Sequence, residues 1–142
     1  MAEYLVVAYQ TATSAELRDH LAHLAHADET ACFTLLVPAT DPSRLLVWEP
    51  GNAVEIAQAK AEEARALLEA ASLTIVRTQV GDASPIIAID EELAAHPGVH
   101  AQVILCTLPP GFSHWLGVDA PAVASQQFEV PVVHIVAGTA YR

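Results

Sequence analysis

Basic residues are scarce in this sequence, which has six Lys and Arg against 17 Asp and Glu and a net charge of −11 over 142 residues. A nucleic-acid-binding protein needs a basic surface that neutralises phosphates, and this chain has no basic run that could supply one. The same charge opposes binding to an anionic membrane surface. We therefore expect neither a nucleic acid nor a membrane as a partner.

Long apolar runs and cysteines are also few. No run reaches the ~20 apolar residues of a membrane-spanning helix, and Glu3 interrupts the N-terminus where a signal peptide would become apolar. The two cysteines, Cys32 and Cys106, lie in apolar strand-like runs without metal-ligand spacing, so we predict buried thiols rather than a disulfide or a metal site. These features favour a cytoplasmic protein.

What the sequence does have is an alternation of two hydrophobic periods, which is typical of repeated strand–helix units. The predicted strands are 3–10, 31–37, 73–80, 101–106 and 130–136. The predicted helices run over about 13–27, 52–71, 84–96 and 119–128. Short links between these elements imply parallel strands joined by right-handed crossovers. We therefore predict a single α/β domain over residues 1–142, with the third strand at a sheet edge.

The predicted helix starts carry residues that suit N-caps. Thr13 is followed by Glu16 three residues later, as in a capping box. Asn52 can cap the next helix, with Glu55 at the third position. Ser84 precedes Pro85, which is favourable in a first helical turn because its missing N–H has no intrahelical partner there. We expect Asp82 to brace the turn before this third helix.

Four stretches together resemble the universal stress protein family: residues 5–8, 80–85, 103–111 and 130–132. The resemblance covers nearly the whole chain in the right order. It implies an open five-stranded parallel sheet of order 3-2-1-4-5 with helices on both faces, a Rossmann-like fold of the adenine nucleotide alpha hydrolase-like type. It also implies a homodimer through the last strand. In such a sheet a ligand binds at the carboxyl ends of the strands where the strand order reverses, here between the first and fourth strands.

Many members of that family hold ATP with the motif G-x2-G-x9-G-(S/T) after the fourth strand. Glycines let the backbone approach the phosphates, and backbone N–H groups bind them. The matching positions here are Thr107, Pro110, Ala120 and Pro121, none of which is glycine. Gln10 stands where the resemblance implies an Asp that contacts adenine. The sequence therefore disfavours ATP or AMP as a cofactor and names no other.

The loop 107–117 contains TLPPGFSHWL, which resembles the T-L-P-P-G-x-S-x-W-L loop of a divergent subgroup of universal-stress-like proteins. That subgroup has Arg where His114 stands, and His is the weaker anion partner because it is mostly neutral at pH 7. Trp115 or Phe112 would either stack on a planar ligand or plug the vacant cleft. The predicted ligand-binding residues are Gln10, Thr11, Val37, Gly81, Thr107, Gly111, Ser113, His114 and Trp115.

Three functional hypotheses follow. The preferred one is a stress-response domain without efficient ATP binding, which acts as a non-catalytic small-ligand-binding or dimeric interaction protein. The alternative is a nucleotide sensor that binds ATP or AMP in a non-standard pocket. The third is a small hydrolase using Ser113 and His114 beside Asp119, although adjacent residues rarely aim at each other and no nucleophile elbow is present. We predict no catalytic residues.

The remaining histidines and one tryptophan give weaker signals. His20, His23 and His26 follow one another at steps of three, so only adjacent members share a helix face, and we predict surface histidines rather than a metal site. His134 lies in the last predicted strand, where we expect a core or dimer-interface residue. Trp48 would serve as a lid over the cleft or as an interface residue.

Overall fold

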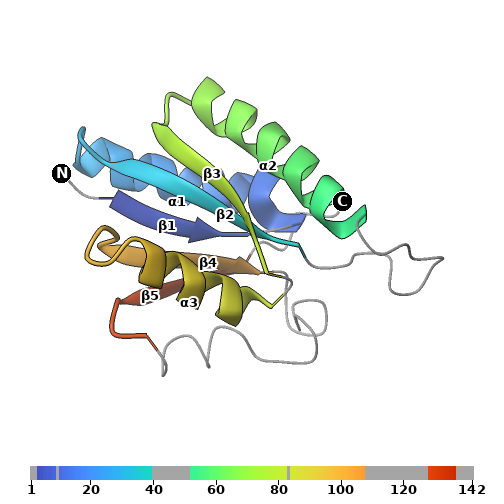
Figure 1. The fold of residues 1–142 in the computed structure, drawn as a ribbon. Coiled ribbons are helices and arrows are strands. Elements are labelled where there is room, and N and C mark those ends of the chain that lie inside the picture. Colours follow the sequence, from blue (N-terminus) through green and yellow to red (C-terminus); the bar gives the residue numbers. More distant parts are fainter. Residues whose placement is uncertain (1–2, 9, 40–51, 83, 108–127, 137–142) are drawn as a thin grey trace.

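The computed structural model describes residues 3–8, 10–39, 52–82, 84–107 and 128–136. The strands in these ranges are β1 (Glu3–Val7), β2 (Cys32–Pro38), β3 (Ile75–Gly81), β4 (Gln102–Thr107) and β5 (Val132–Val136). They form one sheet in the order β3-β2-β1-β4-β5, and each neighbouring pair is parallel. The arrows in Figure 1 accordingly point the same way. The predicted sheet order is confirmed, with β3 at one edge.

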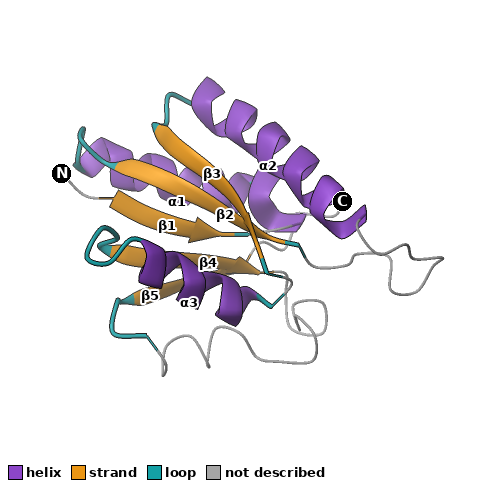
Figure 2. Ribbon diagram, in the orientation of Figure 1, coloured by secondary structure: helices purple, strands orange, loops and turns teal. Residues whose placement is uncertain are grey.

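Helices cover both faces of this sheet. The helices α1 (Ala15–Ala27) and α2 (Asn52–Ala70) pack on one face, and α3 (Pro85–Ala95) packs on the other (Figure 1 and Figure 2). The chain moves one way through β1, β2 and β3 and then returns across the sheet to β4, so right-handed crossovers place α3 opposite the first two helices. Within the described ranges, no helix combines the length and the apolar character that crossing a bilayer requires.

The strands at the centre of the sheet are buried on both sides. Val6 packs in the core under α1 and α2, whereas Leu5 and Val7 pack in the core under α3, and all three are fully buried. Every residue of β2 is buried as well. Such strands have no solvent face, which explains why they appear in the sequence as continuous apolar runs.

The first strand is shorter than predicted because a 3₁₀ helix follows it. The sequence predicts a strand over 3–10, but η1 (Gln10–Thr13) occupies the end of that range. Thr13 is therefore not the N-cap of α1, and that prediction is wrong. Ser14 is the N-cap, and its Oγ accepts a hydrogen bond from the N–H of Leu17 at 3.2 Å. Both residue types cap well, so the backbone around them decides between adjacent positions.

The start of α3 is as predicted. Ser84 is the N-cap and its Oγ accepts from the N–H of Ile87 at 3.4 Å, with Pro85 in the first turn. The N–H of Ser84 in turn donates to Oδ1 of Asp82 at 2.9 Å, so Asp82 does brace this turn. The other strands and α2 lie within two residues of their predicted bounds.

Some predictions fall on parts of the chain that the structure does not describe. Trp48 lies outside the described residues, and so does almost all of the helix predicted over about 119–128. The single domain over 1–142 consequently stays a prediction.

Gly81 ends β3 where this strand passes close to α3. A Cβ atom at this position would lie 2.8 Å from Cβ of Ala88 and 3.0 Å from Cδ1 of Leu36. Gly98 differs, because a Cβ there would meet nothing within 4 Å, but its φ of +73° is one that L side chains rarely adopt. The two glycines are thus required for different reasons, close packing at Gly81 and backbone conformation at Gly98.

We expect Gly81→Ala to lower the free energy of unfolding by about 1–3 kcal/mol, because the added methyl group overpacks the contact with α3. Urea denaturation measures this loss. Adding Ala88→Gly should recover part of it, since the second substitution removes the atom that the new Cβ meets. Gly98→Ala is the matched control, because its backbone strain should show no coupling to Ala88→Gly. Equal stability of Gly81→Ala and the wild type would contradict the packing role.

Candidate functional site

The order of the strands reverses between β1 and β4, and a site in this fold lies at their carboxyl ends. The chain leaves β1 through η1, on the side of the sheet that α1 and α2 cover (Figure 1). The 3₁₀ helix η1 contacts α1, α2 and β4. It therefore lies over the end of β1, beside the strand on the other side of the reversal.

The structure brings together some of the predicted ligand-binding residues. Gln10 and Thr11 begin η1, and Thr107 ends β4, so these three lie on the two segments that meet at the strand reversal. Val37 lies near the end of β2, but its side chain is fully buried in the core under α1 and α2. Gly81 ends the edge strand β3, with β2 between it and β1. The remaining predicted site residues and hydrolase candidates lie outside the described residues: Gly111, Phe112, Ser113, His114, Trp115 and Asp119.

A lysine from α2 contacts η1 near the carboxyl end of β1, and the sequence analysis did not predict this contact. Nζ of Lys60 donates a hydrogen bond to Oγ1 of Thr13, the last residue of η1, at 3.1 Å. The same ammonium lies 3.4 Å from Oε1 of Glu63, one turn along the helix. The Lys60 side chain is 24% exposed. No local motif predicts this contact, because the two partners are 47 residues apart.

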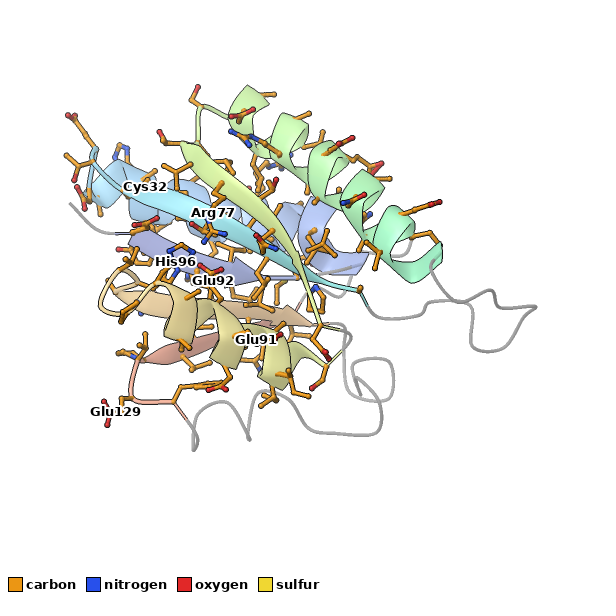
Figure 3. All side chains as sticks on the ribbon, in the orientation of Figure 1. Cys32, Arg77, Glu91, Glu92, His96 and Glu129 are labelled. Atoms are coloured by element: carbon orange, nitrogen blue, oxygen red, sulfur yellow. The ribbon has the colours of Figure 1, made fainter. Side chains whose placement is uncertain are left out.

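A buried carboxylate network lies elsewhere, between α3 and β3. The side chain of Glu92 on α3 is only 4% exposed, and its Oε2 pairs with the guanidinium of Arg77 from β3. Nε2 of His100 lies 3.0 Å from the same oxygen, and Nε2 of His96 lies 3.9 Å from it. Figure 3 shows Arg77, Glu92 and His96 close together. The network links the edge strand β3 to α3 through the pair of Arg77 and Glu92.

The contact also sets the hydrogen-bonding role of Nε2 of His100. A carboxylate can only accept, so Nε2 of His100 carries the hydrogen and donates it to Glu92. The other ring nitrogen, Nδ1, is buried and has no hydrogen-bond partner within the described part of the chain. The side chain of His100 is fully buried. His100 therefore serves as a buried donor to Glu92.

Two open grooves flank the carboxyl end of β3. The groove between β3 and α3 has a volume of about 420 Å³, and its lining includes Glu91, Glu92 and His96. The groove between β3 and α2 has a volume of about 490 Å³ and includes Glu62. Both volumes are in the range of small-molecule sites, but both grooves lie at the edge of the sheet rather than at the strand reversal.

The histidines on α1 differ from one another in exposure. His23 and His26 are exposed, as predicted, but His20 is partly buried, and its Nε2 is buried without a hydrogen-bond partner in the described part of the chain. Burial, with a smaller contribution from His23, lowers the pKa of His20. Among the described residues, no group of three or more potential ligands could hold a metal ion.

His134 does not lie in the core. It is exposed on β5, so that part of the prediction is wrong, because β5 is an edge strand and turns this side chain outward. Its alternative role at an interface stays a prediction. Cys32 and Cys106 are buried and form no disulfide, as predicted. Burial, and secondarily Glu3, raises the pKa of the Cys32 thiol, which disfavours the reactive thiolate.

Comparison with known proteins supports the fold. No protein-family model and no curated protein matches the chain. A solved structure, that of a universal stress protein in complex with cAMP, matches with a TM-score of 0.59 and 15% sequence identity. The match covers 96% of this chain and 98% of that one. At this identity the likeness establishes the fold alone, which is the universal-stress-protein-like, Rossmann-like α/β fold.

We expect Arg77→Met to lower the free energy of unfolding by about 2 kcal/mol, because the buried carboxylate of Glu92 then loses its charged partner. Chemical denaturation measures the change. Arg18→Met is the matched control, since Arg18 pairs with Asp19 at the surface, with side chains 51% and 73% exposed. Such a surface pair contributes at most about 0.5–1 kcal/mol. Equal losses of unfolding free energy in the two variants would show that the Glu92 network stabilises the fold no more than a surface ion pair does.

Proposed function

We propose that this chain is a non-catalytic domain that binds a mononucleotide with a single phosphate, such as AMP or cAMP, at the carboxyl ends of β1 and β4. In this proposal it does not bind ATP efficiently, and it acts as a cytoplasmic sensor in a stress response. The observation that carries the proposal is a contrast. The fold and the strand reversal are those of a universal stress protein, while each glycine position of the polyphosphate motif holds another residue.

The contrast has a direct physical meaning. A triphosphate needs several backbone N–H donors and a close approach of the main chain, which the glycines of the motif allow. Two consecutive prolines in the loop remove two such donors. A nucleotide with one phosphate needs fewer backbone N–H donors. That a protein of the same fold was crystallised with cAMP supports the smaller ligand.

Calorimetric titration of AMP, cAMP and ATP·Mg²⁺ tests this function. We expect AMP or cAMP to bind at least about tenfold more tightly than ATP, a difference of about 1.4 kcal/mol. Gln10→Ala should weaken binding, because Gln10 lies on η1 at the strand reversal. Gln79→Ala is the matched control, since Gln79 lines both grooves at β3 instead. A micromolar dissociation constant for ATP, equal to or below that of AMP, would sink the proposal.

We also propose that the chain forms a homodimer through β5, which is the edge of the sheet opposite β3. Apart from the exposed His134, the residues of β5 are apolar: Val136 is 45% exposed, and Val132, Val133 and Ile135 are half-buried. A strand edge of this kind readily pairs with another strand unless the protein covers it.

At the edge strand β3, side chains of the same chain occupy backbone carbonyls. The carbonyl of Ile75 accepts a hydrogen bond from Arg65 of α2 at 3.0 Å. The carbonyl of Val80 accepts one from the side-chain amide of Gln79, also at 3.0 Å. Polar side chains thus occupy backbone acceptors that a further strand would need. This difference between the two edges favours β5 as the place of self-association.

Sedimentation equilibrium tests the dimer. We expect a dimeric wild type and a shift toward monomer for Val136→Lys, because the interface would lose an exposed apolar side chain and would have to desolvate a charge. The matched control is Val76→Lys on β3, where Val76 is 48% exposed. A monomeric wild type, or dissociation caused equally by both substitutions, would rule out an interface at β5.

A further inference from the structure

We propose that the ammonium group of Lys60 recognises the phosphate of the nucleotide, so that this single side chain gives the site its preference for a nucleotide over a nucleoside. The inference rests on the proposed function and deepens it. It starts from the contact between Lys60 of α2 and Thr13 of η1, with Nζ 3.1 Å from Oγ1. Since η1 also contacts β4, this contact places a cation beside the 3₁₀ helix that adjoins the strand reversal.

The charge balance of the chain gives this cation its importance. At a net charge of −11, the protein as a whole repels a phosphate, so binding one requires a local positive group. The other basic residues in the described ranges have partners outside η1. These pairs are Arg18 with Asp19, Arg65 with Glu69 and the carbonyl of Ile75, and Arg77 with Glu92. Among the described residues, Lys60 is the basic side chain whose hydrogen bond reaches η1.

The present contacts of Lys60 leave it able to take up a phosphate. A lysine ammonium has three N–H donors, of which one reaches the neutral hydroxyl of Thr13 and one reaches Glu63. The Glu63 side chain is 59% exposed, and an exposed ion pair of this kind contributes little free energy. A phosphate can therefore replace Glu63 as the partner. Because the Lys60 side chain is only 24% exposed, its new bond would be less screened than one at the surface.

Two substitutions then have opposite expected effects. Lys60→Met removes the cation and keeps the aliphatic stem, so the dissociation constant of AMP should rise by about tenfold or more, as is typical for the loss of a charge-assisted hydrogen bond. Glu63→Gln removes the competing carboxylate, so AMP should bind roughly threefold more tightly. The affinity for adenosine, which has no phosphate, should not change in either variant.

Calorimetric titration of AMP and adenosine into the wild type and these variants is the test, with thermal denaturation of each variant alongside. Arg65→Met is the matched control: it also exchanges a cation of α2 for Met, but Arg65 pairs with Glu69, and AMP affinity should stay unchanged. Thr13→Val separates charge from structure. It removes the same hydrogen bond as Lys60→Met, so it should lower thermal stability similarly while keeping the preference for AMP over adenosine.

The outcomes distinguish this inference from the proposed function. If AMP binds the wild type and Lys60→Met equally well, or if Thr13→Val loses the preference as completely as Lys60→Met does, the role of Lys60 is overturned and the nucleotide site remains. If neither AMP nor adenosine binds the wild type, the proposed function fails and this inference fails with it. Loss of AMP affinity in Lys60→Met together with a gain in Glu63→Gln would support both.

Discussion

Burial of β1 on both faces is the constraint on which the rest of the structure depends. Leu5, Val6 and Val7 are fully buried between two helical layers. A parallel sheet of this kind must be covered on both sides, and the covering helices need crossovers that leave the carboxyl ends of the central strands open. The position of the candidate site therefore follows from the core, whereas any ligand would depend on the residues placed at that end of the strands.

The parts of the fold that were predictable depend on short-range patterns. The start of α3 was predicted correctly, because Asp82, Ser84 and Pro85 act within a single turn. The cap of α1 was not, because Thr13 and Ser14 are adjacent and equally suitable, and η1 decided between them. Apolar runs predicted the sheet order only together with a resemblance to a known family, since periodicity alone does not say which strands are neighbours.

The candidate site was less predictable because its contacts join distant parts of the chain. The strand reversal could be located from the resemblance, and Gln10, Thr11 and Thr107 do lie on the segments that meet there. Lys60 could not be found, since 47 residues separate it from its partner on η1. The Glu92 network was also missed, because its charged partner Arg77 lies on another element 15 residues away, although Glu92 is the most buried acidic residue in the described ranges. A single sequence contains no local sign of either pairing.

The two edges of the sheet differ, and this difference would limit the size of the proposed assembly. The backbone acceptors of Ile75 and Val80 are occupied within the chain, whereas β5 carries exposed and half-buried apolar side chains. When β5 of one molecule pairs with β5 of another, the contact is isologous, and both outer edges of the joined sheet are β3 strands. The occupied carbonyls of Ile75 and Val80 disfavour pairing with a further copy there, so the proposed assembly would close at two molecules rather than grow into a filament.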